Sequence, residues 1–352
     1  MSHQTEVSKR LAIKYPLVQG PFGAGLSSTK LVVSVSEAGG LGSYGVYSMS
    51  APQITKLAEE IRCLTVKPFV LNLWIPQMPA TSPTPEDLQH HIALFDNYFA
   101  ELGISRPKAP ERFGQDYDSQ IRAILDVRPP VFSFVFGIPE PTILQECRTR
   151  GIATIGTATT PDEAVALDAA GVDCIVASGF EAGGHRGSFL RPAEECLMGT
   201  FALVPQVVDR VKAPVIAAGG IADCRGIKAA FALGAQGAQI GTAFLACEES
   251  GTSPDHRALL FDERCRQTVL TKVFTGRLAR SIRNRLIEEL GVRDQALLPY
   301  PMQGWLTGSL RPAAVARGRT DLIALSSGQA APLIRAKDAA TLFAELVRGL
   351  VP

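Results

Sequence analysis

The chain has 352 residues, 46% of them hydrophobic and 20% charged, so it can bury a sizeable core and lacks the composition of a disordered protein. Its formal net charge of +1 gives no broad field for binding nucleic acid or an anionic membrane. The first residues lack the apolar stretch of a signal peptide, and no segment has the roughly 20 uninterrupted apolar residues of a membrane helix. We therefore expect a soluble, cytoplasmic protein without nucleic-acid or membrane partners.

Cysteine spacing excludes two common site types. The seven cysteines are scattered along the chain without a CxxC pair, which matches neither a disulfide framework nor a zinc site. The sequence therefore predicts reduced thiols in a reducing compartment and no bound metal.

Eight short apolar runs predict the strands of a parallel barrel, because such strands are buried on both sides and appear as continuous hydrophobic segments. Helix-like stretches follow most of them, several beginning with an early proline beside acidic residues, as in Thr160-Pro-Asp-Glu163. Strand and helix in alternation predict an α/β fold, here a (β/α)8 TIM barrel. The predicted strands are Pro16 to Phe22, Gly40 to Gly45, Phe69 to Ile75, Val131 to Gly137, Ala153 to Ala158, Cys174 to Gly179, Val215 to Gly220 and Gln239 to Leu245.

Two segments interrupt this alternation, 77–118 and 247–321, and we call them the excursions. Each follows the C-terminal end of a predicted strand, which in a barrel is the active-site rim. We expect them to meet as an inserted, mainly helical lid or substrate domain. Residues 1–76, 119–246 and 322–352 would then form the barrel, and a last helix, Lys337 to Leu350, would close it.

Glycines after the seventh and eighth strands predict a phosphate site. Gly219 and Gly220 follow one strand, and the segment Gln239-Ile240-Gly241-Thr242 spans the other. Loops at these places commonly hold a phosphate in barrels, because glycine lets backbone N–H groups approach closely. Tight strand-to-helix turns would explain one such loop equally well, but two at matching places favour a phosphorylated cofactor.

His185 is the best candidate for catalysis. It lies in a glycine-rich loop, Ser178 to Phe189, after the sixth strand, where a core role is less expected. Its ordinary pKa of about 6.5 suits proton exchange near neutral pH. His3, His90, His91 and His256 are interpreted as surface residues.

Two weaker signals lie near the first and third strands. Pro21, Phe22 and Gly23 belong to a glycine-containing loop after the first strand, and no Rossmann GxGxxG accompanies it. Asn72 is an amide within an apolar strand and must form a hydrogen bond if it is buried. Its partner would be the backbone or the edge of a cofactor ring.

The sequence, including the glycine-rich segments described above, resembles the nitronate monooxygenases, particularly their class I branch, along most of its length. AGGHRG, AAGGIAD and IGTAF together form a specific combination. The matching segments are VQGPFGAGLS, SEAGGLGSYG, KPFVLNLWIP, FEAGGHRGSF, APVIAAGGIAD, QIGTAFL, VFTGRLARSIRNRL, LPYPMQ and SSGQ.

The resemblance implies an FMN-dependent enzyme that oxidises alkyl nitronates or nitroalkanes with O2 to a carbonyl compound and nitrite. His185 matches the family's active-site histidine, and Tyr300 matches an aromatic residue of the substrate pocket, although packing alone could explain a tyrosine there. A homodimer is compatible with the sequence. The residues implied to contact FMN are Pro21, Phe22, Gly23, Asn72, Ser178, Gly183, Gly184, Gly219, Gly220, Gln239, Ile240, Gly241 and Thr242.

Ser178 departs from the family pattern, because the family usually has a glutamine there that contacts the flavin. A shorter side chain changes the surroundings of the ring and leaves the substrate open. The alternatives are an NAD(P)H-dependent flavin reductase acting on a quinone or enoyl thioester, a flavin oxidoreductase acting on a specialised metabolite, and a catalytically idle scaffold on the same fold.

Overall fold

Eight parallel strands form the barrel, in a computed structural model that describes residues 4–77, 83–291 and 297–350. The strand order is β1-β9-β8-β6-β5-β4-β3-β2, and a parallel bridge between Val18 and Leu41 joins the two edge strands. Closure removes both sheet edges, so the predicted barrel is confirmed. The strands are β1 (Leu17–Gln19), β2 (Gly42–Gly45), β3 (Phe69–Trp74), β4 (Val131–Val135), β5 (Ala153–Ala158), β6 (Cys174–Ser178), β8 (Val215–Ala218) and β9 (Gly237–Ile240).

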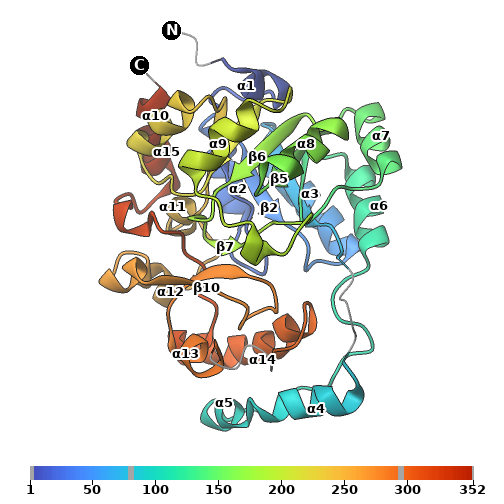
Figure 1. Cartoon of the computed structure of the whole chain (residues 1–352), viewed down its shortest axis with the longest axis vertical. Coiled ribbons are helices and arrows are strands. Elements are labelled where there is room, and N and C mark those ends of the chain that lie inside the picture. The colour runs from blue at the N-terminus through green and yellow to red at the C-terminus, as the bar shows by residue number, and fades with distance from the viewer. Residues whose placement is uncertain (1–3, 78–82, 292–296, 351–352) are drawn as a thin grey trace.

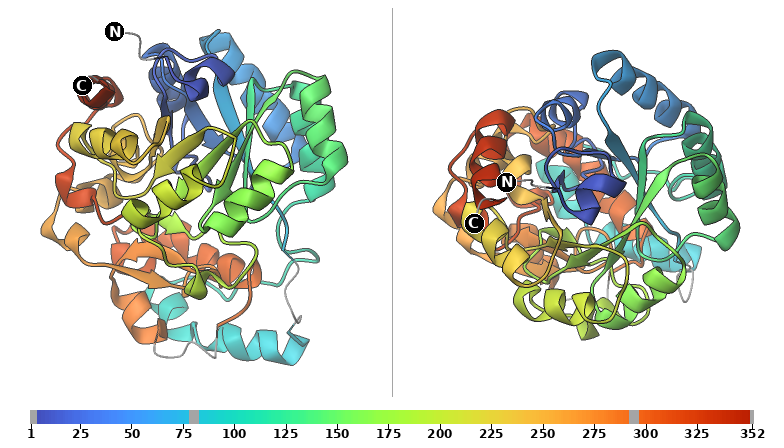
Figure 2. Two further views of the ribbon diagram at one scale, coloured as in Figure 1. Left: turned by 45° about the horizontal axis from the view of Figure 1, so that its top comes forward. Right: turned by 90° about the horizontal axis from the view of Figure 1, so that it is seen from above.

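Helices follow the barrel strands and surround them, as the view from above shows (Figure 2). Proline begins several of them, including Pro52, Pro141 and Pro161, where a missing N–H costs no helical hydrogen bond. The C-terminal helix α15 (Ala339–Val347) packs against α2 (Thr29–Glu37) and α10 (Cys224–Ala232), as expected of a helix that closes the barrel. The helices are α2 (Thr29–Glu37), α3 (Ala51–Leu64), α6 (Tyr117–Val127), α7 (Pro141–Thr149), α8 (Pro161–Ala169), α9 (Thr200–Val208), α10 (Cys224–Ala232) and α15 (Ala339–Val347).

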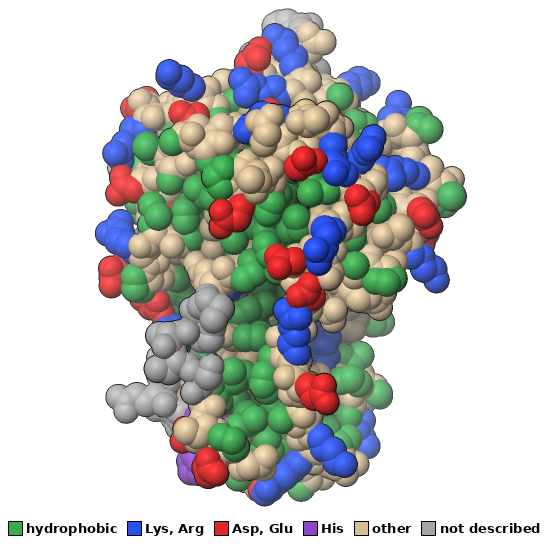
Figure 3. All heavy atoms as spheres, turned by 90° about the vertical axis from the view of Figure 1, so that its right-hand side faces the viewer, with side chains coloured by type: hydrophobic (Ala, Val, Ile, Leu, Met, Phe, Trp, Pro, Cys, Tyr) green, Lys and Arg blue, Asp and Glu red, His purple; other side chains and the backbone are tan. Residues whose placement is uncertain are grey.

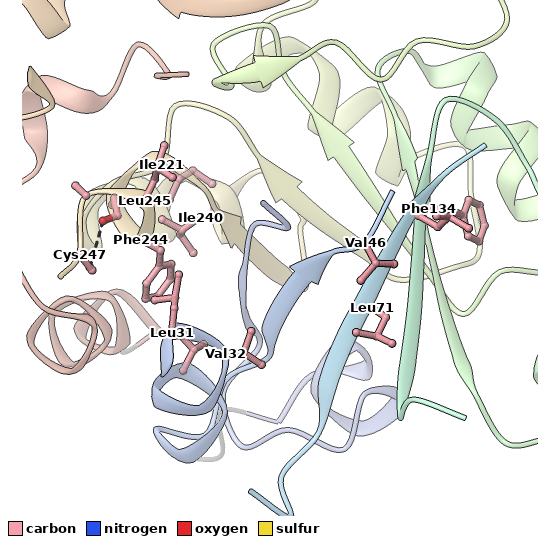
Figure 4. Close-up of a cluster of buried hydrophobic side chains, with 14 of the residues drawn as sticks. Leu31, Val32, Val46, Leu71, Phe134, Ile221, Ile240, Phe244, Leu245 and Cys247 are labelled. Carbon is pink, nitrogen blue, oxygen red and sulfur yellow. Dashed lines mark hydrogen bonds between the residues drawn. The ribbon is translucent and has the colours of Figure 1, made fainter. Parts of the chain in front are cut away.

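The hydrophobic core fills the space between the strands and these helices (Figure 4). Leu31 and Val32 from α2 and Phe244 are fully buried in it. A separate cluster includes Val18, Val70 and Ile216 from three strands, with Val7 and Leu11 of the N-terminal segment, where α1 spans Glu6–Arg10. Within the described residues, no helix is long and apolar enough to cross a membrane.

The prediction for the eighth strand was partly wrong. The strand ends at Ile240, and the apolar residues after it form a short helix, α11 (Thr242–Leu245), instead of continuing the strand to Leu245. A short buried apolar run looks the same in a strand and in a helix, so periodicity could not separate the two. The first strand is likewise shorter than predicted, because residues 20–25 form a rim loop.

The two excursions lie together on one side of the barrel (Figure 1). Glu101 of the first excursion accepts hydrogen bonds from Arg285 and Arg319 of the second at 2.8 to 3.0 Å, and the Tyr98 hydroxyl donates to Glu289 at 2.6 Å. They contain α4 (Pro85–Ala93), α5 (Asp96–Glu101), α12 (Pro254–Leu259), η2 (Glu263–Arg266), β10 (Thr268–Thr271), β11 (Ala279–Ile282), α13 (Arg285–Gly291), α14 (Met302–Ala316) and η4 (Thr320–Leu322).

A small antiparallel sheet connects the second excursion to the barrel rim. Its order is β10-β11-β7, where β7 (Gly184–His185) belongs to the loop after β6. The inserted part is thus mainly helical, as predicted, but strands form its junction with the barrel. Because β11 pairs directly with β7, the excursion helps to hold the loop that carries His185.

Candidate active site

A cavity of about 860 Å³ lies at the C-terminal ends of the barrel strands, beneath the second excursion. Rim residues such as Ser178, Gly219 and Gly241 form its barrel side, and Tyr300 and residues of α14 line the opposite side. In the side view, hydrophobic side chains gather at the waist between the barrel and the excursions (Figure 3). The volume is within the range of small-molecule and cofactor sites.

His185 lies on the wall of this cavity and its ring is fixed from two sides. Its Nε2 is 2.8 Å from the hydroxyl of Thr275, which belongs to the second excursion. The rings of Trp74 and His185 contact each other in a T-shaped arrangement, with centroids 4.8 Å apart. Pairing of His185 with Ala279 fixes the backbone as well. The sequence-based prediction of His185 therefore agrees with a cavity residue of defined orientation.

Burial, and to a smaller extent the positive charge of Arg277, lower the pKa of His185 from its ordinary 6.5 to about 3. The imidazole is therefore neutral at pH 7. A neutral ring accepts a proton or a hydrogen bond, but it does not attract an anion by charge.

A buried arginine shapes the loop before His185. Arg186 is 1% exposed and donates to the carbonyl oxygens of Gly179 at 2.7 Å and Ser178 at 2.9 Å. Arg280 of β11 donates to the next carbonyl, that of Phe180, at 2.9 and 3.0 Å. The two guanidinium groups thus hold three successive carbonyls and keep the rim loop in one conformation. This explains why arginine follows histidine in AGGHRG.

The glycines at the ends of β8 and β9 form an open cradle. Gly219 and Gly220 have φ of 96° and 73°, in the left-handed region that favours glycine. A Cβ on Gly219 would lie 2.9 Å from the carbonyl oxygen of Gly179, so no larger residue fits there. Across the cradle, the Thr242 hydroxyl accepts a hydrogen bond from the N–H of Gly328 at 2.8 Å.

The predicted site residues gather around the cavity, with one exception. Ile240 is fully buried in the hydrophobic cluster beside Phe244, so its predicted contact with the cofactor is wrong for the side chain (Figure 4). Neighbouring side chains of a strand point to opposite faces, and Gln239 is the one that reaches the cavity. The predicted residues that line the cavity are Pro21, Phe22, Gly23, Asn72, Ser178, Gly183, Gly184, His185, Gly219, Gly220, Gln239, Gly241, Thr242 and Tyr300.

Asn72 lines the cavity and has a side-chain partner. Its Nδ2 donates to the hydroxyl of Ser133 on the neighbouring strand at 2.8 Å. The backbone partner considered from the sequence is therefore not what the structure shows for this donor. The bond fixes the amide plane at the edge of the cavity.

Sequence reasoning missed the aromatic wall and the cation within it. Tyr47 stacks on Trp74 with centroids 3.7 Å apart, and Phe136 forms a T-shaped pair with Trp74 with centroids 5.0 Å apart. Arg277 lies over the rings of Phe136 and Tyr300, 4.1 Å from each centroid. Arg277 stands in the segment VFTGRLARSIRNRL, but its ring partners come from distant parts of the chain, so spacing gave no signal.

His256 was wrongly predicted to be a surface residue. It is 2% exposed, on the short helix α12, and its Nε2 lies 3.2 Å from the carbonyl oxygen of Ser326. The helix packs against the chain segment before α15, which sequence position alone did not reveal. Burial lowers the pKa of His256 to about 4, although the carbonyl of Ser326 opposes the shift.

Acid should destabilise the protein through His256. The unfolded state binds a proton below pH 6.5 and the folded state only near pH 4, so stability present at neutral pH is lost as the pH falls through this window. We expect the free energy of unfolding to fall by about 2 kcal/mol between pH 7 and 5 through this residue. His256→Gln, whose amide can donate a hydrogen bond without titrating, should reduce this difference in unfolding free energy between pH 7 and pH 5, measured by denaturant unfolding. The same difference in the variant as in the unmodified protein would contradict the prediction.

Fold and site together define a (β/α)8-barrel protein with a cavity at the C-terminal rim. The family model described as nitronate monooxygenase matches residues 4–351, so the chain belongs to the nitronate monooxygenase family and is an oxidoreductase. A probable nitronate monooxygenase of Staphylococcus aureus strain Newman is 39% identical over 99% of this chain and 97% of its own length.

Solved structures of other proteins are also similar to this chain in fold and in sequence. A nitroalkane oxidase from Streptomyces ansochromogenes has a TM-score of 0.90 and 36% identity, covering 98% of both chains. FabK from Thermotoga maritima has a TM-score of 0.75 and 30% identity, covering 99% of this chain and 96% of its own. The family resemblance predicted from the motifs is thereby confirmed.

Proposed function

We propose that this protein catalyses the FMN-dependent oxidation of alkyl nitronates or nitroalkanes by O2 to a carbonyl compound and nitrite. The observation that carries the proposal is a neutral histidine, His185, on the wall of a cavity that also contains an open glycine cradle. One end of such a cavity suits a phosphorylated cofactor and the other a small substrate.

The residues at the rim fit FMN. Gly219, Gly220, Gly241 and Thr242 would hold the phosphate, because the backbone there is open and a Cβ at Gly241 would meet no heavy atom closer than 4.0 Å. Asn72, Ser178, Gly183 and the segment 21–23 would surround the ring. When bound, FMN supplies the redox chemistry, while the protein supplies binding and orientation.

His185 would accept the α-proton of a neutral nitroalkane. Its low pKa keeps the ring unprotonated and ready to accept a proton, and the contact with Thr275 fixes its orientation. With a preformed nitronate no proton needs to leave, and the same ring would then serve only as a contact of the substrate.

Aromatic side chains would receive the alkyl part of the substrate. Trp74, Phe136 and Tyr300 line the cavity near His185, and Trp74 contacts all three other rings of this group. Apolar walls exclude water from the reacting carbon and strengthen electrostatic interactions there. Short alkyl chains should therefore be preferred to polar substituents.

Oxygen consumption by the purified yellow protein with an alkyl nitronate tests the proposal. We expect rapid oxygen uptake with release of nitrite. Anaerobic mixing with NADH or NADPH should leave the flavin absorbance unchanged. Bleaching by either nicotinamide without nitronate turnover would contradict the proposal and indicate a flavin reductase.

A further inference from the structure

Arg277 is a half-buried cation for which the described part of the chain provides no anionic partner. Its side chain forms none of the ion pairs seen among these residues, and its Nη1 is covered without a hydrogen-bond acceptor. Removing an unpaired charge even partly from water is costly for folding. Such a cost is expected where the charge serves a ligand.

The carboxylate that lines the same cavity as Arg277 already accepts hydrogen bonds from another residue. Among the described residues that line the cavity, Glu181 is the one acidic residue. Its oxygens accept hydrogen bonds from the N–H of Thr200 at 2.9 and 3.0 Å and from the Thr200 hydroxyl at 3.0 Å. Glu181 thus caps the start of α9, and no other anion among the described cavity residues competes for Arg277.

The surroundings of Arg277 select the shape of its ligand. The rings of Phe136 and Tyr300 lie over the guanidinium at 4.1 Å and Nη1 is covered, so the edge formed by Nε and Nη2 is the polar part left for a ligand. That edge is planar and matches the two oxygen atoms of a nitronate, nitrate or carboxylate group. A spherical anion would use it less well.

Arg277 and His185 act on the same end of the cavity. Thr275 contacts His185 through its hydroxyl, and the same hydroxyl accepts a hydrogen bond from the backbone N–H of Arg277 at 3.3 Å. The positive charge of Arg277 also reaches the His185 ring, whose pKa it lowers. The charge of Arg311, another arginine in this cavity, is felt at Tyr47 and His256 instead.

We propose that Arg277 binds the planar anionic group of the substrate, with both oxygens on its guanidinium edge, and so places the α-carbon beside His185. This rests on the proposed function and adds a division of labour to it: the arginine supplies the charge and the histidine supplies the proton site. The site would then recognise small planar monoanions as a class, with apolar substituents directed to the aromatic wall.

Nitrate is a suitable probe, because it is a planar monoanion that is not a substrate. A ligand that binds the folded state raises the melting temperature, so nitrate should stabilise the purified protein more than chloride at equal ionic strength. Arg277→Met should abolish this difference, whereas Arg311→Met should preserve it. Equal effects of the two salts on the unmodified protein, or a loss confined to Arg311→Met, would overturn the assignment.

Kinetics provide the second measurement. Loss of a charge-assisted hydrogen-bonding partner in Arg277→Met should raise the KM for an alkyl nitronate about 10- to 100-fold. The KM for the neutral parent nitroalkane should change little, and Arg277→Lys should give an intermediate value. Equal changes in both KM values would overturn the proposal. If the unmodified protein does not turn over nitronates, the proposed function fails, and the nitrate titration still decides the role of Arg277.

Discussion

His185→Asn should leave the protein yellow while reducing turnover of a neutral nitroalkane by about 10²- to 10⁴-fold, the usual contribution of a general base. The asparagine side chain is too short to replace Nε2, so the contact with the Thr275 hydroxyl is lost together with the proton acceptor. The backbone pairing of β7 with β11 does not involve the ring. We therefore expect the fold and flavin binding to survive.

A matched pair of substrates makes this prediction specific to proton transfer. A preformed nitronate has already lost its α-proton, so its turnover should fall much less than that of the parent nitroalkane. Steady-state kinetics with both forms, together with the melting temperature and flavin content, provide the measurement. Near-normal turnover of the neutral substrate would remove His185 from the mechanism, and equal losses with both would indicate positioning alone.

The barrel could be predicted because its signals are local. Most strands are short apolar runs and most barrel helices begin with their own proline or capping residue, so both can be recognised within a few residues. His185, Gly219 and Gly241 were identified in the same way, since each stands in a glycine-rich segment directly after a strand. Ile240 shows the limit, because the motif IGTAF contains it but the strand turns its side chain into the core.

The electrostatic character of the site could not be predicted from sequence. The low pKa of His185 depends on the second excursion covering the ring and on Arg277, which lies 92 positions later in the chain. The stacking of Arg277 between Phe136 and Tyr300 joins the end of β4 with the second excursion. Contacts of this kind depend on how distant segments pack, and no spacing rule in one sequence describes them.

Gly241→Leu should yield a folded protein that has lost its flavin. Gly241 has φ −96° and ψ −83°, outside the left-handed region that favours glycine, and a Cβ there meets only Phe22, at 4.0 Å. The leucine side chain would therefore enter the open cradle without disturbing the backbone. Loss of two charge-assisted hydrogen bonds to a phosphate corresponds to an affinity lower by about 10²- to 10⁴-fold.

Gly308→Leu provides the matched control for this substitution. Gly308 lies on α14, lines the same cavity, and a Cβ there would meet no heavy atom within 4 Å. The same bulk at the excursion side should leave the flavin in place, because the proposed phosphate cradle lies at the ends of β8 and β9. The ratio of flavin to protein absorbance after purification, and after incubation with added FMN, measures the outcome. A fully loaded Gly241→Leu protein would refute the phosphate site, whereas loss from both variants would show that bulk anywhere in the cavity excludes the cofactor.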